Sequence, residues 1–220
     1  MTRKIKTTQA GPRRRYDSSR RKEQQRQTRL EIAKAARDVF LERGYAGATL
    51  EAIAAQAGVA VETLYAAFEN KRSLLAFVLD ISLAGDDQPI PIIERARPQA
   101  VLRDTDQRRQ LEAFAADITE ILARGAAVFE VTRIAGKTEP EIGERVEHLL
   151  EERLRNMRLM AERVAANGPL HPGIDVSRAA QTIWIVTSPD VYMLTTAYLG
   201  WAKEEYRRWL IETLKRLLLP

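Results

Sequence analysis

Residues 47–75 read GATLEAIAAQAGVAVETLYAAFENKRSLL, and apolar residues recur in this segment with the period of two short helices. The first stripe, at positions i, i+3, i+4 and i+7, consists of Leu50, Ile53, Ala54 and Ala57. Thr49 can cap this helix through its hydroxyl group, and Gly58 ends it. The second stripe consists of Val61, Leu64 and Phe68. The segment therefore predicts a helix-turn-helix unit, in which the small Ala54 allows a close crossing and the second helix is free to enter a DNA major groove.

This segment and the helix predicted before it resemble the DNA-binding domain of the tetracycline-repressor (TetR) family of bacterial transcription regulators. The resemblance begins in LEIAKAARDVFLERGYAGAT, residues 30–49, and covers roughly residues 28–80. It depends on the spacing of Ala54, Gly58, Leu64, Tyr65, Phe68 and Lys71. The alternative interpretation is an ordinary segment of a helical bundle. The resemblance implies an all-α fold, with an N-terminal three-helix helix-turn-helix domain and a C-terminal helical domain for ligand binding and dimerisation.

Composition limits the class of protein. Of the 220 residues, 45 % are hydrophobic and none is cysteine. A chain without cysteine has neither a disulfide framework nor a thiolate nucleophile, which favours a reducing compartment. No apolar run reaches the roughly 18 residues of a membrane span, and the basic start lacks the apolar segment of a secretory signal. We therefore expect a soluble, all-helical, cytoplasmic protein that does not bind membranes.

Positive charge is concentrated near the N-terminus. Residues 1–30 contain eleven Lys and Arg against two acidic residues, a net charge of +9. Residues 31–72 sum to −1, from five basic and six acidic residues, and the remainder sums to −3. A basic tail is often only a solvated segment, but this one leads directly into the predicted DNA-reading helices. We predict that residues 1–26 form a basic, disordered arm that neutralises phosphates and reaches into an adjacent minor groove. The candidate side chains are Arg13, Arg14, Arg15, Arg20, Arg21, Lys22, Arg26 and Arg29.

The predicted recognition helix lacks the usual base-reading side chains. Residues 60–68 contain no Arg, Lys, Asn or Gln, so the common bidentate contacts to guanine and adenine are absent from this segment. Val61 and the methyl group of Thr63 can pack on thymine methyl groups, and Glu62 can accept a hydrogen bond from a cytosine amino group. Alternatively, Glu62 only stabilises the positive N-terminus of the helix. Ala60 and Ala66 are the remaining candidate contacts of this helix.

Three further residues match positions of the TetR family that contact the phosphate backbone. The resemblance implies such a contact for the hydroxyl of Tyr65, although an aromatic residue on a helix is often core. It implies the same for Lys71, at the start of the fourth helix, and for the capping hydroxyl of Thr49. Ala60 departs from the family pattern, which has a hydroxyl residue there, and the absence of that cap costs on the order of 1 kcal/mol. Phosphate contacts position the recognition helix without specifying sequence.

The rest of the chain predicts further helices. A fourth helix over 71–84, with Leu74, Leu75 and Val78 facing inward, is followed by a loop at 85–91. Thr138 and Glu141 form a predicted capping box, with Pro140 in the first turn. A short helix is expected at 92–97, a longer one from about 106 to 124, and a separate short helix from there to 134. The helix that begins at the capping box is expected to end at about 166. Further helices are expected from 176 to 187 after Asp175, from Ser188, and after Gly200. The predicted organisation is an arm (1–26), a DNA-binding domain (27–72, motif about 50–69) and an effector-binding and dimerisation domain (73–220).

The C-terminal region supplies candidate residues for self-association and for an effector pocket. The resemblance implies a two-fold dimer, which would place two recognition helices one DNA turn, ~34 Å, apart. Candidate interface residues are Ile183, Thr187, Tyr206, Trp209, Leu210 and Leu214. Candidate pocket residues are Phe114, Phe129, Arg133, Gln181, Thr182, Trp184 and Tyr192. Protomer core is the alternative interpretation of both sets, and an apolar or amphipathic effector fits the composition of the region best.

Enzyme chemistry has little support in the sequence. His148 and His171 are the only histidines, and without cysteine they form no recognisable zinc signature. No phosphate-binding loop is present. We therefore expect no catalytic activity, no metal and no cofactor. The sequence predicts a homodimeric repressor that a small molecule releases from a pseudo-palindromic DNA operator. The alternatives are an architectural DNA-binding protein without an effector, and a helical interaction module that does not bind an operator.

Overall fold

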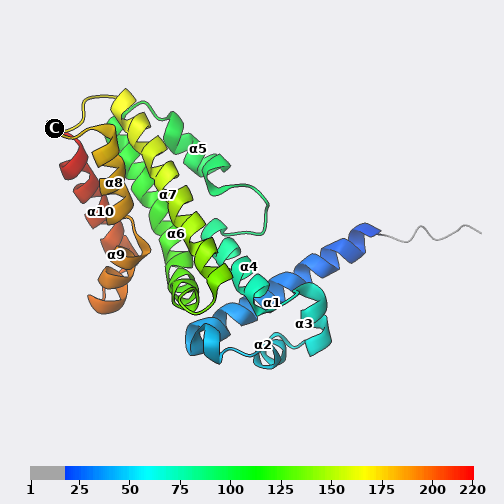
Figure 1. Ribbon diagram of the computed structural model, residues 1–220. Helices are drawn as coiled ribbons and strands as arrows, with labels where there is room; N and C mark the ends of the chain where they lie inside the picture. Colours follow the sequence, from blue (N-terminus) through cyan, green and yellow to red (C-terminus); the bar gives the residue numbers. More distant parts are fainter. Residues whose placement is uncertain (1–17) are drawn as a thin grey trace, which may run out of the picture.

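The structure is a computed structural model that describes residues 18–220, and over that range it is built from helices (Figure 1). In chain order these are α1 (Ser18–Gly47), α2 (Leu50–Ala57), α3 (Val61–Ala67), α4 (Lys71–Ala84), η1 (Ile92–Glu94), α5 (Ala96–Arg103), α6 (Gln107–Ala135), α7 (Pro140–Ala166), α8 (Val176–Val186), α9 (Pro189–Met193), η2 (Leu194–Tyr198) and α10 (Lys203–Leu218). The predicted all-α class is confirmed. None of the helices between residues 18 and 220 is long and apolar enough to cross a lipid bilayer.

Helices α1, α2 and α3 pack together at one end of the molecule, and α4 leads from them into the larger helical domain (Figure 1). The apolar stripe of α2 faces α1, so Ile53 and Ala54 are fully buried. Leu64 of α3 and Phe68 after it are also buried there. This core continues into the C-terminal part of α6 and the start of α7, where Val128, Ala135 and Ile142 belong to the same apolar cluster. The two domains therefore share buried surface.

Helix α1 begins earlier than the sequence analysis predicted. Residues 18–26, assigned there to a disordered arm, form its first turns and project beyond the three-helix domain (Figure 1). This segment is rich in Arg, Gln, Lys and Glu, which favour helices, and adding turns to an existing helix is easier than starting one. Residues 1–17, with Arg13, Arg14 and Arg15, lie outside the described residues. Near its other end α1 bends at Gly44, where φ is +67°.

The C-terminal domain is organised around the long antiparallel helices α6 and α7, with α8 and α10 on one side and α5 on the other (Figure 1). The prediction of a break in α6 near residue 124 is wrong. Gly125 lies inside the helix because α4 packs closely there: a Cβ atom on Gly125 would lie 2.5 Å from Cδ2 of Leu83. The core of this domain includes Leu111, Met160 and Ile183.

The predicted helix starts are confirmed at two positions and wrong at a third. Asp175 caps α8 by accepting a hydrogen bond from the Arg178 amide at 2.7 Å, and Ser188 caps α9 in the same way. The capping box at the start of α7 does not form. Glu139 occupies the cap position without a side-chain hydrogen bond, while the Thr138 hydroxyl donates to the carbonyl of Ala135.

Candidate functional site

The helix-turn-helix unit is held by local hydrogen bonds that the sequence specifies. Oγ1 of Thr49 accepts a hydrogen bond from the Ala52 amide at 3.1 Å, which caps α2. Gly58 ends α2 with φ of +68°, a conformation that costs residues with a Cβ atom roughly 1–2 kcal/mol. Helix α3 begins directly after Ala60, which makes no side-chain cap. The turn therefore places α3 across α2, as predicted.

One face of α3 is buried and the other is open to solvent. Leu64 anchors the helix in the core, and Val61 is half-buried beside it. The exposed residues are Ala60, Glu62, Thr63, Tyr65 and Ala66. Tyr65 is 52 % exposed, so its interpretation as a core aromatic is excluded. Helix α3 thus presents a continuous surface of candidate base-contacting and phosphate-contacting side chains.

Lys71 has a structural role that the sequence analysis did not predict. Its Nζ donates hydrogen bonds to the main-chain carbonyls of Tyr45, at 2.9 Å, and Ala48, at 3.0 Å. The ammonium group also lies 4.3 Å from the centre of the Tyr45 ring. These carbonyls lie at and just beyond the C-terminal end of α1, where a cation compensates unsatisfied backbone acceptors. Two of the three ammonium donors are therefore used inside the protein, and a phosphate contact of the third stays a prediction.

Arg29 and Arg26, both predicted to contact DNA, are engaged within the protein. The Arg29 guanidinium donates to the Ala67 carbonyl at the end of α3 and lies over the rings of Phe68 and Phe77, 4.3 and 4.8 Å from their centres. Arg26 bonds both oxygens of Asp87 at 2.8 Å. Neither guanidinium is free for a phosphate in this arrangement. Arg20, Arg21 and Lys22 are exposed on the projecting part of α1.

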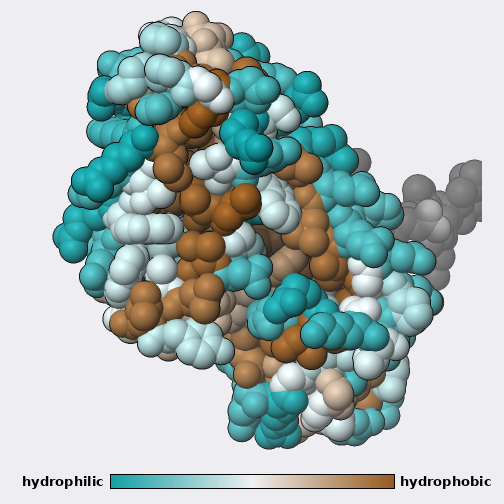
Figure 2. Space-filling model, turned by 60° about the vertical axis from the view of Figure 1, so that its left-hand side comes forward, coloured by the Kyte–Doolittle hydropathy of each residue, from teal (hydrophilic) through white to brown (hydrophobic). Residues whose placement is uncertain are grey.

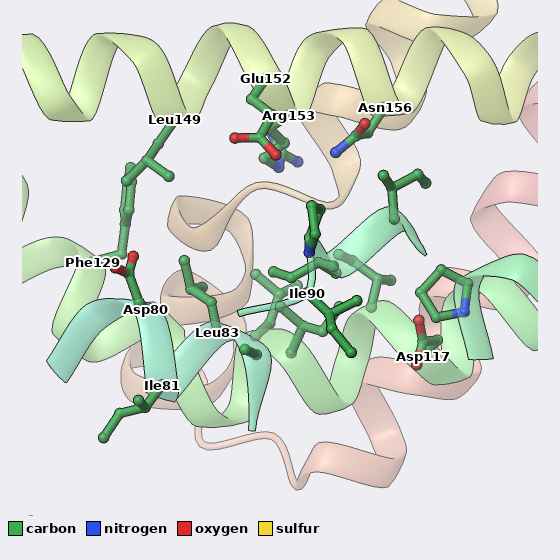
Figure 3. A pocket seen from close by; sticks show the side chains of 18 of the residues that line it. Asp80, Ile81, Leu83, Ile90, Asp117, Phe129, Leu149, Glu152, Arg153 and Asn156 are labelled. Atoms are coloured by element: carbon green, nitrogen blue, oxygen red, sulfur yellow. The ribbon is translucent and has the colours of Figure 1, made fainter. Parts of the chain in front are cut away.

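A cavity of about 540 Å³ lies in the C-terminal domain between α4, α5, α6 and α7 and the loop at 85–91 (Figure 3). Its walls are mainly apolar, and they include Phe77, Phe114, Phe129, Ile90, Met157 and Met160. Its size lies within the range of small-molecule sites. Because α4 forms one wall and begins directly after the helix-turn-helix unit, the cavity and α3 are connected through a single helix.

Some of the charged side chains around the cavity have partners within residues 18–220, and others are partly buried without one there. Arg145 pairs with Asp80 at 2.5 Å. Arg153 donates to the carbonyl of Trp184 at 2.6 Å and to the hydroxyl of Thr187 at 2.8 Å. Burial lowers the pKa of the Arg153 guanidinium to about 10, and burial raises the pKa of the Asp117 carboxyl. Asp117 on α6 and Glu152 on α7 lie on different walls of the cavity (Figure 3); Asp117 is half-buried and Glu152 is exposed.

The helix-turn-helix segment matches a known family of proteins. Residues 32–78, which span most of α1, the helix-turn-helix unit and the start of α4, match the family model described as bacterial regulatory proteins, tetR family. The chain carries a TetR-family DNA-binding domain. No curated protein matches the sequence.

Solved structures of transcriptional regulators share the fold over nearly their whole length. The fatty acid degradation regulator FadR from Bacillus halodurans is 21 % identical, with a TM-score of 0.67, and the match covers 85 % of this chain and 94 % of that one. FadR from Bacillus subtilis, solved with stearoyl-CoA, is 22 % identical with a TM-score of 0.65, covering 84 % and 96 %. NalD, the secondary repressor of the MexAB-OprM multidrug efflux pump in Pseudomonas aeruginosa, is 21 % identical with a TM-score of 0.62, covering 89 % and 98 %. At these identities the likeness shows a common TetR-type fold.

The effector-pocket residues predicted for this TetR-type chain are only partly brought together. Phe114 and Phe129 line the cavity. The others lie elsewhere: Arg133 pairs with Glu130, Gln181 is exposed, Thr182 is half-buried on α8, Trp184 packs on Arg153, and Tyr192 packs on Tyr206. These five residues do not border the cavity, because helical periodicity identifies an inward face without showing which inward side chains border empty space.

The cavity also uses residues that the sequence analysis missed. Arg95 holds the loop at 85–91 through a bidentate pair with Asp86, at 2.7 and 3.0 Å, and through bonds to the carbonyls of Ala84, Gln88 and Ile90. The loop contributes Pro89 and Ile90 to the wall. The available signal was the apolar sequence PIPII, residues 89–93, which spans the end of the predicted loop and the start of the helix predicted at 92–97.

The predicted dimerisation residues lie in the wrong place for a partner. Ile183, Thr187, Tyr206, Leu210 and Leu214 are each 0 % exposed. They pack α8 and α10 onto the protomer's own core, which corrects the prediction, and Trp209 is half-buried against the same core. Large apolar side chains are instead exposed elsewhere in the C-terminal region, at Ile185, Leu194, Tyr198, Leu199 and Leu217.

Proposed function

We propose that this TetR-family transcriptional regulator is a homodimeric repressor that a small molecule in the cavity releases from its operator. The observation that carries the proposal is the role of α4. Its residues Phe77, Ile81 and Leu83 line the cavity, and its first residue, Lys71, binds the end of α1. A ligand that displaces α4 would therefore change the position of the helix-turn-helix unit.

The surface of the C-terminal domain supports self-association. The side of the molecule that carries α8, α9 and α10 has apolar side chains gathered in bands (Figure 2). Tyr198 and Leu199 are 81 % and 65 % exposed, and an exposed apolar cluster of this kind commonly marks an interface. We assign the interface to Ile185, Leu194, Tyr198, Leu199 and Leu217. A two-fold dimer through this surface gives the two α3 helices that successive major grooves require.

DNA contacts are proposed in two groups. Val61, Glu62 and Thr63 read bases at the start of α3, with Ala60 and Ala66 allowing close approach. Thr49, Tyr65 and the free donor of Lys71 hold phosphates. Arg20, Arg21 and Lys22, together with residues 1–17, add non-specific attraction to the phosphate backbone. Deletion of residues 1–17 leaves every described helix complete and should flatten the dependence of log affinity on log salt by about 0.9 for each phosphate that is no longer neutralised.

The decisive experiment is selection of bound fragments from random-sequence DNA by the purified protein at physiological salt. We expect a two-fold symmetric motif, bound ~10³-fold or more tightly than random duplex. The apolar walls and the stearoyl-CoA complex of Bacillus subtilis FadR favour an effector with a large apolar part. Retention of fragments without a motif would instead indicate an architectural protein, and no retention would indicate an interaction module.

A further inference from the structure

Helix α3 has an exposed face that carries no guanidinium, ammonium or amide group. The helix lies inside residues 32–78, the segment that matches the TetR family, and on the outside of the three-helix domain (Figure 1). Glu62, Thr63 and Ala66 are exposed and share this face, opposite the fully buried Leu64. The bidentate contacts with which Arg, Lys, Asn and Gln recognise guanine and adenine are therefore absent from this face.

Three cationic side chains that flank α3 are engaged within the protein. Arg29 donates a hydrogen bond to the last carbonyl of α3. Lys71 donates to two main-chain carbonyls at and just beyond the end of α1, at 2.9 and 3.0 Å. Arg72 pairs with Glu141 of α7 at 2.8 Å. In this arrangement none of the three replaces the base-reading donors that α3 lacks, and the phosphate contact proposed for Lys71 carries no sequence information.

The groups that remain on the exposed face of α3 differ in how well they distinguish bases. The carboxylate of Glu62 only accepts hydrogen bonds, so it cannot bond N7 or O6 of a purine. The hydroxyl of Thr63 both donates and accepts, so it bonds several base edges without selecting one. The methyl groups of Thr63 and Ala66 can pack on the C5-methyl group of thymine, which no other unmodified base carries in the major groove. That methyl group is therefore the feature of a base pair that this face distinguishes best.

We propose that this regulator reads its operator through the C5-methyl groups of thymines, which Thr63 and Ala66 contact. Both side chains are short, so α3 must lie deep in the groove, and the small exposed Ala60 and Ala66 allow this approach. The inference rests on the proposed function, in which α3 binds an operator in the major groove. It adds the chemical group that is read. It also implies that a cytosine methylated at C5 is read as a thymine is.

The test uses the full chain and the two-fold symmetric duplex that the DNA selection recovers, with one thymine at a time replaced by uracil. Uracil pairs as thymine does but lacks the methyl group. Burial of one such group is worth about fourfold in affinity, so we expect about a fourfold loss at the thymines that face α3 and no loss at the others. Where cytosine replaces one of these thymines, 5-methylcytosine should bind about fourfold more tightly than cytosine. The salt concentration is held constant, because phosphate contacts depend on it.

Purines in which carbon replaces N7 test the opposite mode of recognition. This exchange removes the acceptor that arginine, lysine, asparagine and glutamine use in the major groove. At the base pairs that face α3 we expect the exchange to leave the affinity unchanged, because the exposed face of α3 offers no amide or cationic donor to N7.

Matched variants assign the methyl contact to Thr63. Thr63→Ser removes the side-chain methyl group and keeps the hydroxyl, so the loss caused by uracil should disappear at one position of each half-site. Thr63→Val keeps a methyl group in place of the hydroxyl, so that loss should persist. Thr105→Ser removes the same methyl group from an exposed loop between α5 and α6, and it is the control that should show the wild-type pattern. Thermal unfolding confirms that each variant is folded.

The outcomes separate this inference from the proposed function. A selected motif whose affinity is unchanged by uracil at every position would overturn methyl recognition and leave sequence-specific regulation intact. A loss of affinity on removal of N7 at the base pairs that face α3 would do the same. An equal effect of uracil in Thr63→Ser and the wild type would overturn the assignment to Thr63. Recovery of no motif would overturn the proposed function, and this inference with it.

Discussion

Arg26 and Asp87 form an ion pair between the first helix of the DNA-binding domain and the loop that borders the cavity. Both carboxylate oxygens lie 2.8 Å from Nη1 of Arg26. The two residues are 61 positions apart, and the Asp87 side chain is only 12 % exposed. Glu23, one turn earlier on α1, also bonds the guanidinium, and together these carboxylates raise its pKa. A displacement of the loop by a ligand is therefore applied directly to α1.

Arg26→Gln should weaken the communication between cavity and DNA. The coupling between an effector and a second ligand is typically 5- to 150-fold in affinity, and we expect the variant to reduce it several-fold. The free energy of unfolding should change little, because the Arg26 side chain is exposed and exposed ion pairs contribute little to stability. The measurement is DNA affinity with and without a bound effector. Arg21→Gln, on the same exposed segment, is the control, and restoration by the exchange Arg26→Asp with Asp87→Arg would identify the pair as the cause.

Arg29→Met should destabilise the fold and loosen α3. The substitution removes a charged hydrogen bond to the Ala67 carbonyl and the packing of the guanidinium on the rings of Phe68 and Phe77. We expect the free energy of unfolding to fall by about 1–3 kcal/mol, measured in urea. Arg29→Lys keeps the charge but not the planar group, and its stability should lie between those of the wild type and Arg29→Met. If Arg29→Met lowered DNA affinity with no loss of stability, the side chain would instead be a direct phosphate contact.

Ala60→Ser should stabilise α3. Helix α3 starts without a side-chain cap, and a hydroxyl at this position can accept a hydrogen bond from the backbone amides of its first turn. We expect a gain of about 1 kcal/mol in the free energy of unfolding. Ala66→Ser adds the same group inside the helix, where it provides no cap, and should bring no gain. Equal effects of the two substitutions would show that the cap is not the cause.

Asp117→Asn should be more stable than the wild type at neutral pH, and this difference in stability should shrink in acid. Burial raises the pKa of this carboxyl above its value in the unfolded chain, so the folded state binds the proton more tightly. Its favourable contribution is complete below the unfolded pKa of about 4 and is lost as pH rises through the higher folded value. Urea unfolding of both proteins at pH 4 and pH 7 measures this. A difference that did not grow with pH would show that the carboxylate is fully solvated.

Local sequence was sufficient for the helix-turn-helix unit. The cap at Thr49, the turn at Gly58 and the stripe around Leu64 each depend on neighbours within a few residues, so periodicity and turn chemistry predicted them correctly. The face of α3 that is open to solvent followed from the same pattern.

Features that depend on contacts between residues far apart in sequence could not be predicted from local periodicity. The spacing of Tyr206 and Leu210 correctly predicted which face of α10 is buried. That face packs on the protomer's own core and not on a second chain. The cavity depends on how α4 and the loop at 85–91 lie against α6 and α7, which no single helix encodes. The internal hydrogen bonds of Lys71 and Arg29 were missed because their carbonyl partners lie 23 to 38 residues away in sequence.

The apolar cluster beneath the helix-turn-helix unit does not end at the domain boundary. Phe129 of α6 belongs to this cluster and also forms part of the cavity wall. The free energy that holds α1 to α3 in place is therefore partly supplied by a side chain that a ligand would touch. The two domains should consequently unfold in one cooperative transition, and occupancy of the cavity should slow amide hydrogen exchange in α1 as well as in α6.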